Sequence, residues 1–541
     1  MFLSPPKSAR RRRRRGGRGP GGPSLSIVFV VIVVLAALGY GGYEVVKAQL
    51  DSDDRRATVE QFVRAWEKGD YERMYALLDA PSRRANPKVS FLADYRRANR
   101  AATVEKVTVR RVGPLLEGGR VRVPVTVTTK DFGKLEGTIT FKATETDDVT
   151  RVAWERHQRL PGLRPGEEPR RRLGKQPERA NIYDAAGRLL NSDPTGASIA
   201  GTAGKKPTGL ERIYDERLGG RRSVSLRFGD RVIARVPGRK GRSVNTTIRL
   251  GLQRAAQNAL GDRVGGIAVI KPSDGSVLAL AGLAVSAPQP PGSSFKIITA
   301  AAALQHGMAK MSSSYPVRTA ATLSGVKLRN AGDESCGGSL TNSFAHSCNS
   351  VFGPLGAKLG AKRLVAAAER FGFNEQPEIP AAKKSTIPAA KDLRDSLAVG
   401  ASAIGQDRDL ATPLEMASVA ATIANRGVRI KPWLAGKRNP RKRVVSAKVA
   451  GQVRDMMVAV VQNGTGTAAA IPGVTVAGKT GTAELVSTAD QAQRDENTTA
   501  WFVAFAPASK PRVAVAVMLV GAGQGGASAA PIAKQVIQAA L

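Results

Sequence analysis

One short segment constrains this chain of 541 residues more than any other: Ser293, with Lys296 three residues later, opening the apolar run 297–304. Ala, Ile and Leu without a breaker predict a buried helix, and Pro-Gly at 291–292 marks its start. Residues three apart share a helix face, so the hydroxyl and the amine are neighbours. A serine hydroxyl needs an adjacent base, and burial or a second cation makes lysine available as one. Alone, Ser-x-x-Lys also fits an ordinary helix start with a surface lysine.

Two further motifs follow in order. Ser347-Cys348-Asn349 and Lys479-Thr480-Gly481-Thr482 complete the sequence Ser-x-x-Lys, Ser-x-Asn, Lys-Thr-Gly, which is the signature of serine β-lactamases and penicillin-binding proteins. The surrounding segments also resemble the transpeptidase domains of class B penicillin-binding proteins, and this resemblance covers residues 245–541. The segments that carry it are 266–280, 404–406, 412–414, 464–467 and 501–507.

The resemblance implies a catalytic role for five side chains. Ser293 attacks the carbonyl carbon of a D-alanyl-D-alanine bond, and Lys296 takes its proton. Ser347 passes that proton to the leaving amine. Lys479 keeps Lys296 neutral and attracts the substrate's terminal carboxylate, while Asn349 holds the Lys296 amine or the donor peptide.

The resemblance also implies a substrate cradle on the Lys-Thr-Gly strand. The hydroxyls of Thr480 and Thr482 bind the substrate carboxylate, and Gly481 lets the substrate backbone approach closely. The backbone N–H groups of Ser293 and Thr482 form the oxyanion hole. The chemistry requires neither a metal ion nor an organic cofactor.

The two cysteines, Cys336 and Cys348, leave two interpretations open. An even pair in a chain exported from the cytoplasm permits a disulfide. Two separate thiols, with Cys348 simply occupying the middle of Ser-x-Asn, are slightly preferred. Two cysteines without histidines at ligand spacing do not make a zinc site. A Ser-His-Asp triad is disfavoured because neither His306 nor His346 lies in a recognisable context.

The N-terminal region predicts a membrane anchor. An arginine run at 10–15 precedes the uncharged, largely apolar stretch 24–43, which is long enough to span a bilayer. The arginines place the N-terminus in the cytoplasm and the rest of the chain outside. A cleaved signal peptide is the less favoured alternative. The net charge of +39 alone would suggest nucleic acid, but the apolar stretch and the absence of nucleic-acid-binding motifs favour anionic lipids and wall polymers instead.

The chain as a whole is predicted to be a multidomain α+β protein. Residues 52–157 combine helical periodicity with strictly alternating valines, and they resemble the NTF2-like domain of low-affinity, methicillin-resistance-type penicillin-binding proteins. The catalytic domain is expected to hold an antiparallel sheet flanked by helices, plus a helical subdomain. The predicted parts are a basic tail at 1–23, a transmembrane helix at 24–43, the NTF2-like domain at 52–157, a short pedestal or dimerisation domain at 165–243 and the transpeptidase domain at 245–541.

The resulting hypothesis is a D,D-transpeptidase of the bacterial cell membrane, anchored by one helix. It would act on peptidoglycan stem peptides, be acylated by β-lactams and work beside a glycosyltransferase, since the chain lacks the Glu-Asp-x-x-Phe motif of that activity. The alternatives are a D,D-carboxypeptidase, a serine β-lactamase, and a penicillin sensor or scaffold. A class A β-lactamase would need a glutamate with an asparagine four residues later. No such pair occurs between Asn349 and Lys479.

Overall fold

The computed structural model describes residues 47, 49–147, 149–436, 439–484 and 498–541. Two compact units make up the chain. Unit 1 contains the described residues up to Gln176 together with Arg222–Arg239, and unit 2 contains Pro177–Arg221 and Lys240–Leu541. The range 165–243 is therefore divided between the units.

Unit 1 pairs helices with an antiparallel sheet. A helix over 49–67 ends at a turn through Gly69 and Asp70, as the sequence predicted. Three helices follow: α2 (Tyr71–Ala76), α3 (Ala80–Ala85) and α4 (Lys88–Ala102). The main sheet has the order β1-β3-β4-β5, with β2 paired to β3. Its strands are β1 (Val104–Val109), β2 (Leu115–Leu116), β3 (Arg120–Thr129), β4 (Gly133–Thr146) and β5 (Val149–Ala153).

Alternating residues of β3 build the core of unit 1. Its four valines, Val121, Val123, Val125 and Val127, are all buried, which confirms the period-2 prediction. They pack with aromatic side chains of unit 1, among which the Phe91 ring of α4 lies 4.6 Å from the ring of Trp154, just after β5, between centroids. A second, three-stranded sheet has the order β6-β8-β9 and consists of β6 (Pro169–Leu173), β8 (Val224–Phe228) and β9 (Arg231–Val236).

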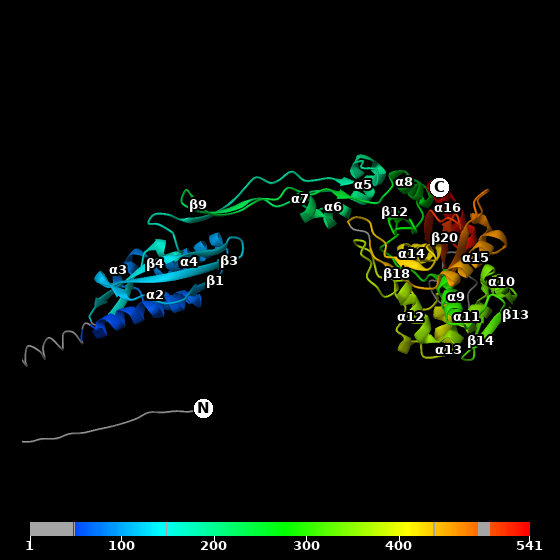
Figure 1. Ribbon diagram of the computed structural model, residues 1–541, viewed down its shortest axis with the longest axis horizontal. Coiled ribbons are helices and arrows are strands. Elements are labelled where there is room, and N and C mark those ends of the chain that lie inside the picture. Colours follow the sequence, from blue (N-terminus) through cyan, green and yellow to red (C-terminus); the bar gives the residue numbers. More distant parts are fainter. Residues whose placement is uncertain (1–46, 48, 148, 437–438, 485–497) are drawn as a thin grey trace, which may run out of the picture. The chain divides into compact units, whose positions relative to one another are not determined.

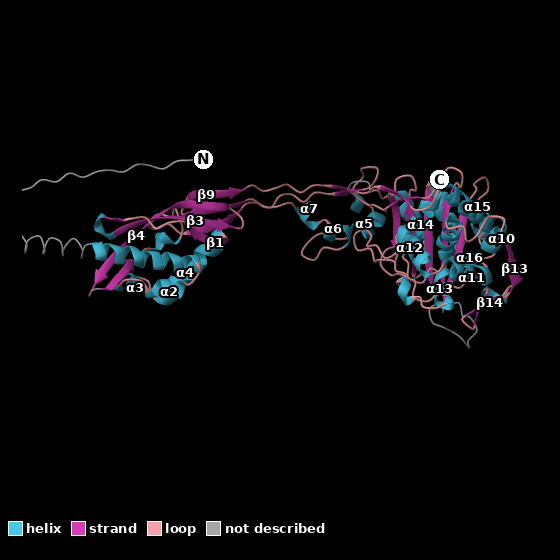
Figure 2. Cartoon of the chain, turned by 60° about the horizontal axis from the view of Figure 1, so that its bottom comes forward, coloured by secondary structure: helices cyan, strands magenta, loops and turns pink. Residues whose placement is uncertain are grey.

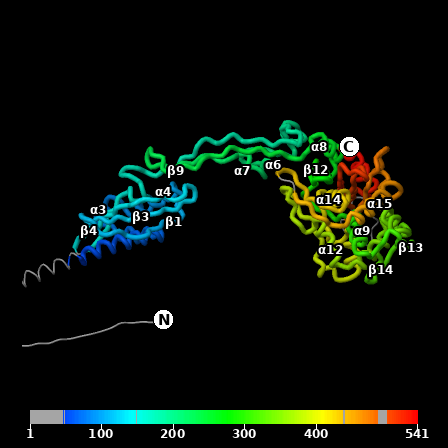
Figure 3. The backbone as a smooth tube through the Cα atoms, in the orientation of Figure 1, coloured from blue at the N-terminus to red at the C-terminus, as the bar shows by residue number. Residues whose placement is uncertain are grey.

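Unit 2 is built around a five-stranded antiparallel sheet with the order β12-β11-β21-β20-β19. The predicted hairpin is β11 (Gly265–Ile270) and β12 (Val277–Gly282), and the two C-terminal strands predicted to be adjacent are β20 (Thr498–Ala506) and β21 (Val513–Val520). The edge strand β19 (Ala477–Glu484) carries the Lys-Thr-Gly motif. The backbone runs through the whole helical middle of unit 2 before it returns to β19 (Figure 3).

Helices cover both faces of this sheet (Figures 1 and 2). Alternate strand residues such as Val515 and Phe502 pack against α8 (Leu250–Leu260) and α16 (Gly525–Ala540) on one face. The strand residues between them, whose side chains point to the other face, pack against α9 (Lys296–Gln305), α14 (Pro413–Ala424) and α15 (Ala447–Asn463). Because both faces are covered, the strands read as apolar runs rather than as alternating patterns.

The remaining elements of unit 2 are short or belong to the helical subdomain. The subdomain contains α10 (Leu340–Ala345), α11 (Asn349–Leu359), α12 (Ala361–Phe371) and α13 (Ser396–Ala403). Small pairs beside it are β13 (Ser314–Arg318) with β16 (Cys336–Ser339), β14 (Ala320–Leu323) with β15 (Val326–Arg329), and β17 (Val428–Ile430) with β18 (Arg441–Arg443). The N-terminal part has β7 (Ile182–Tyr183), α5 (Pro194–Ala200), α6 (Gly209–Ile213), α7 (Asp215–Gly219) and β10 (Val244–Asn245).

The α+β character and the sheet flanked by helices agree with the prediction from the sequence. The predicted tail at 1–23 and the predicted anchor at 24–43 lie outside the described residues. Within the described ranges, no helix combines the length and the apolar character that crossing a bilayer requires.

Candidate active site

Ser293 lies in a tight turn that leads into a buried helix. The turn is a 3-10 helix, Gly292–Phe295, and α9 follows at Lys296, so the serine precedes the α-helix that the sequence placed it in. Two contacts fix the turn: the N–H of Gly292 donates to the carbonyl of Gly405 at 2.9 Å, and Trp501 Nε1 donates to the carbonyl of Pro290 at 2.9 Å. The hydroxyl is thereby held at the edge of the sheet.

The Lys296 amine lies among four oxygen atoms. Nζ is 2.9 Å from Ser293 Oγ, 2.6 Å from the carbonyl oxygen of Ser347, 3.2 Å from Ser347 Oγ and 2.7 Å from Asn349 Oδ1. The carbonyl and the amide oxygen can only accept hydrogen bonds. A neutral amine has two hydrogens, and these two acceptors take both. Its lone pair is then left for the hydroxyl of Ser293, which is the arrangement of a base beside its nucleophile.

The Ser347–Asn349 segment links two elements of the helical subdomain. It connects α10 to α11, and Ser347 itself has a φ of +62°, a conformation uncommon for residues other than glycine. Asn349 Nδ2 donates to the carbonyl of Arg329 at 2.8 Å. That contact fixes the amide so that its oxygen faces Lys296.

Lys479 reaches the same serine from β19. Its Nζ donates to Ser347 Oγ at 2.9 Å and to the carbonyl of Thr480 at 3.1 Å, and it lies 5.6 Å from the centre of the Phe344 ring. The structure thus joins the three motifs in one chain of contacts: Lys296 touches Ser293 and Ser347, and Lys479 touches Ser347.

Both lysines are completely buried, and burial lowers the pKa of each. The pKa of Lys296 lies well below its ordinary value of 10.5, first because of burial and second because of the charge on Lys479. Burial lowers the pKa of Lys479 to about 7. Among the residues that the structure describes, no carboxylate pairs with either amine. Because two neighbouring positive charges repel each other, a charged Lys479 favours the neutral form of Lys296, which is the form that can act as a base.

The nucleophile turn lies directly against β19. A Cβ atom at Gly292 would lie 2.5 Å from the carbonyl oxygen of Thr482, and one at Gly481 would lie 3.1 Å from the backbone nitrogen of Ser294. The backbones around Ser293 and Thr482 are therefore neighbours, as an oxyanion hole between them requires. The space beside Gly481 is taken by this turn and by Trp501, so glycine is needed here for packing, which is a different reason from the predicted approach of substrate.

A comparison with known families agrees with this geometry. The penicillin binding protein transpeptidase domain matches residues 265–538 of the chain. The chain belongs to the penicillin-binding protein transpeptidase family.

Individual relatives give the same result. The peptidoglycan D,D-transpeptidase PbpA of Mycolicibacterium smegmatis is 37% identical over 407 residues, which are 62% of this chain and 80% of that protein. PbpA of Mycobacterium tuberculosis strain H37Rv is 34% identical over 401 residues, 62% of this chain and 79% of that protein. The solved structure of penicillin-binding protein A from M. tuberculosis as a penicillin G acyl-enzyme complex is 30% identical, has a TM-score of 0.57, and covers 67% of this chain and 99% of that one.

A disulfide lies inside this penicillin-binding domain. Cys336 of β16 is bonded to Cys348, with 5.7 Å between the Cα atoms. The slightly preferred expectation of two separate thiols was wrong. Because Cys348 is the central residue of Ser-x-Asn, the bond ties the segment that holds Ser347 and Asn349 to a neighbouring strand.

Sequence reasoning missed three contributors to the site. The carbonyl of Arg329 orients Asn349, and a backbone acceptor leaves no signal in a sequence. Gln406 Nε2 donates weakly to the carbonyl of Thr482 at 3.4 Å. Thr465 Oγ1 lies 2.6 Å from Thr480 Oγ1. The segments 404–406 and 464–467 resemble the family in sequence, but the resemblance implies no role for these two residues.

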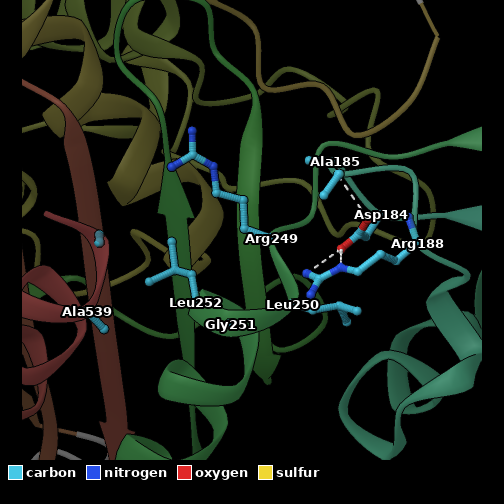
Figure 4. A pocket seen from close by; sticks show the side chains of 10 residues that line it. Asp184, Ala185, Arg188, Arg249, Leu250, Gly251, Leu252 and Ala539 are labelled. Atoms are coloured by element: carbon cyan, nitrogen blue, oxygen red, sulfur yellow. Dashed lines mark hydrogen bonds and ion pairs between the residues drawn. The ribbon is translucent and has the colours of Figure 1, made fainter.

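A separate pocket lies away from the motif residues (Figure 4). It has a volume of about 400 Å³ and lies where the 184–188 turn meets the start of α8 and the end of α16. Asp184 forms an ion pair with Arg188 beside it. The pocket contains none of the residues of the three motifs, and the candidate active site does not include it.

Proposed function

We infer that this protein is a peptidoglycan D,D-transpeptidase that cross-links stem peptides through a serine acyl-enzyme and is acylated by β-lactams. The observation that carries this inference is the Lys296 amine, which is buried, deprived of carboxylate partners among the described residues and 2.9 Å from Ser293 Oγ. Membership of the family and the relatives named above support it.

The first half-reaction forms the acyl-enzyme. The Ser293 hydroxyl transfers its proton to the Lys296 lone pair while Oγ attacks the carbonyl carbon of the penultimate D-alanine. The negative charge that develops on the carbonyl oxygen is stabilised by the backbone N–H groups of Ser293 and Thr482. The tetrahedral intermediate collapses as the bond to the terminal D-alanine breaks, and the leaving amine takes the proton from Lys296 through the hydroxyl of Ser347.

The second half-reaction reverses the direction of the proton. The amine of an acceptor stem peptide attacks the ester carbonyl and loses a proton through Ser347 to Lys296. The Ser293 oxygen leaves and regains its hydrogen from Lys296, which restores the enzyme. Lys479 keeps the Ser347 hydroxyl in place at 2.9 Å through both halves, and its charge attracts the donor's carboxylate.

Labelling with a fluorescent penicillin tests the assignment. The wild-type chain should gain one covalent adduct, located by mass spectrometry on the peptide that contains Ser293. The Ser293→Ala variant should gain none, while Ser294→Ala, which alters the adjacent hydroxyl, should still be labelled. An adduct that persists in Ser293→Ala would refute the assignment.

The lifetime of the adduct separates a transpeptidase from a β-lactamase. The glutamate that activates water in class A β-lactamases has no counterpart in contact with Ser293, Lys296 or Ser347 among the described residues. We expect the penicilloyl-enzyme to last minutes or longer. Compared with a typical turnover near 10 per second, a release about 10³-fold slower corresponds to roughly 4 kcal/mol of additional barrier. Turnover of penicillin at several per second would favour the hydrolase instead.

We further propose that residues 24–43 anchor the protein in the bacterial cell membrane, with the N-terminus in the cytoplasm and the catalytic domain outside. The apolar stretch and the arginines at 10–15 support this orientation. In spheroplasts, external protease should digest a C-terminal tag and spare an N-terminal one. Protection of the C-terminal tag would contradict the proposal.

Two finer proposals concern unit 1 and a partner. We propose that residues 52–157, which lie within unit 1, form an NTF2-like spacer of the type found in low-affinity, methicillin-resistance-type penicillin-binding proteins; helices packed on an antiparallel sheet support this. A glycosyltransferase is the proposed partner, because cross-linking needs glycan strands that this chain has no motif to make. A chain that begins near residue 165 should still be acylated by penicillin near the wild-type rate if it folds. A loss of acylation in the folded protein would mean that residues 52–157 shape the site.

A further inference from the structure

Thr465 connects two of the catalytic motifs without belonging to either. Its backbone N–H donates to the carbonyl of Ala345 at 3.1 Å, at the end of α10 and two residues before Ser347. Its hydroxyl oxygen lies 2.6 Å from Thr480 Oγ1 on β19 and 3.4 Å from the same Ala345 carbonyl. Thr465 thus lies between the Ser-x-Asn segment and the Lys-Thr-Gly strand.

The backbone around Thr465 is closely packed. A Cβ atom at Gly464 would lie 2.4 Å from the carbonyl oxygen of Ala345, and one at Gly526, at the start of α16, would lie 2.4 Å from the carbonyl oxygen of Thr465. Both neighbours are backbone atoms that cannot rotate away. The Thr465 side chain is therefore held in register with β19 by the elements on either side.

The two hydroxyls are joined by one hydrogen bond, and either of them can be its donor. Thr480 can donate to Thr465 while Thr465 donates to the carbonyl of Ala345 at 3.4 Å. When Thr480 turns its hydrogen to another acceptor, Thr465 can donate to Thr480 instead, at 2.6 Å. Lys479 Nζ, which has no lone pair in its charged form, donates to Thr480 Oγ1 at 3.4 Å from another side.

With Thr465 as donor, the Thr480 hydroxyl accepts from Thr465 and Lys479 and has its own hydrogen available for a ligand. Thr480 is buried, and the hydrogen bonds of its hydroxyl within the described residues are those to Thr465 and Lys479. A ligand carboxylate at Thr480 would supply a charged acceptor for that hydrogen, which is a stronger acceptor than the Thr465 hydroxyl.

We propose that Thr465 is a positioning residue for transpeptidation: its hydroxyl donates to Thr480 and so turns the Thr480 hydrogen toward the carboxylate of the substrate or the β-lactam. The inference rests on the proposed function. In this proposal Thr465 acts through Thr480 and does not contact the ligand. It predicts that removing the Thr465 hydroxyl weakens recognition of the carboxylate in particular.

The test compares two ligands on the full-length protein. Acylation rate constants are measured by mass spectrometry for benzylpenicillin, which has a free carboxylate, and for its methyl ester, which has none. The variants are Thr465→Val, which keeps the shape and removes the hydroxyl, and Thr465→Ser, which restores the hydroxyl. The control is Thr467→Val, the same change at an exposed position two residues away.

Thr465→Val should acylate with benzylpenicillin about 10- to 100-fold more slowly, the range expected if the hydrogen bond from Thr480 to the charged carboxylate is lost. The methyl ester should react at nearly the wild-type rate, and the pH profile should keep its shape. Thr465→Ser and Thr467→Val should resemble the wild type with both ligands. If Thr465→Val does not fold, Thr465→Ala removes the same hydroxyl with less bulk and is measured in its place.

Two results would overturn the inference while leaving the proposed function intact. One is an equal loss of acylation rate by Thr465→Val with benzylpenicillin and with its methyl ester, which would make Thr465 a general structural residue. The other is an unchanged acylation rate of Thr465→Val with benzylpenicillin. If neither the wild type nor Thr467→Val forms an adduct with benzylpenicillin, the proposed function fails and the inference fails with it.

Discussion

Replacing Asn349 by aspartate tests whether a neutral Lys296 is the base. The substitution is nearly isosteric and places a carboxylate where Asn349 Oδ1 now lies, 2.7 Å from Lys296 Nζ. It also removes the donor that bonds to the carbonyl of Arg329. An opposite charge at this distance favours the protonated amine, so the pKa of Lys296 should rise and the neutral form should become rarer.

The magnitude follows from the geometry. With the negative charge shared by two oxygens, the charge centres are about 4 Å apart, and an effective dielectric constant of about 20 gives an attraction of roughly 4 kcal/mol. That corresponds to about three pKa units. The desolvation of the introduced carboxylate offsets part of it, so we expect acylation at pH 7 to fall by about 10- to 1000-fold.

The assay is the pH dependence of acylation by benzylpenicillin. In Asn349→Asp the rise of the acylation rate with pH should occur at higher pH, and alkaline buffer should restore part of the lost rate. Asn349→Ala removes the same hydrogen bonds without adding charge. Its acylation rate should therefore fall, while the rise of that rate with pH should stay at the same pH or move to lower pH. If Asn349→Asp acylates at the wild-type rate with an unchanged profile, Lys296 is not the base that the geometry indicates.

Three further predictions concern stability and the nucleophile turn. Replacing Cys336 and Cys348 by serine should lower the free energy of unfolding by about 3 kcal/mol, the chain-entropy value for a loop of this length, measured by denaturant titration. Burial raises the pKa of Glu415 to about 7. As the pH rises, the carboxyl ionises first in the unfolded chain, so the free energy of unfolding should fall by about 3 kcal/mol between pH 4.5 and about 7 and level off above. Glu415→Gln should remove this pH dependence in thermal unfolding measured at several pH values. Gly292→Ala would bring a methyl group 2.5 Å from the Thr482 carbonyl oxygen, so both the melting temperature and the acylation rate should drop; unchanged values would show that the turn can move away from β19.

Local patterns made much of the fold predictable. The valines of β3 and the apolar strands of the β11–β12 and β20–β21 pairs could be recognised because burial on one or both faces determines residue type. The Ser293–Lys296 contact was also predictable, since one helical turn separates the two residues. These features depend on neighbours in the chain or on simple periodicity.

Features that depend on distant backbone could not be predicted. The carbonyl of Arg329 that orients Asn349 carries no side-chain signal, and a serine at position 347 does not indicate a φ of +62°. The disulfide depends on a Cα distance that spacing in the sequence does not give. Likewise, 165–243 reads as one segment, although Pro169–Leu173 pairs with Val224–Phe228 in unit 1 while the chain between them belongs to unit 2.

The two buried lysines have a consequence for how this protein can evolve. An unfolded lysine is protonated at neutral pH, whereas the folded site disfavours that proton, so each amine lowers the stability that the fold would otherwise have. An apolar residue of similar size at Lys296 should make the protein harder to unfold and leave it inactive. Selection for stability and selection for catalysis therefore oppose each other at Lys296 and Lys479, and any gain in thermal resistance that keeps the enzyme working has to arise elsewhere in the chain.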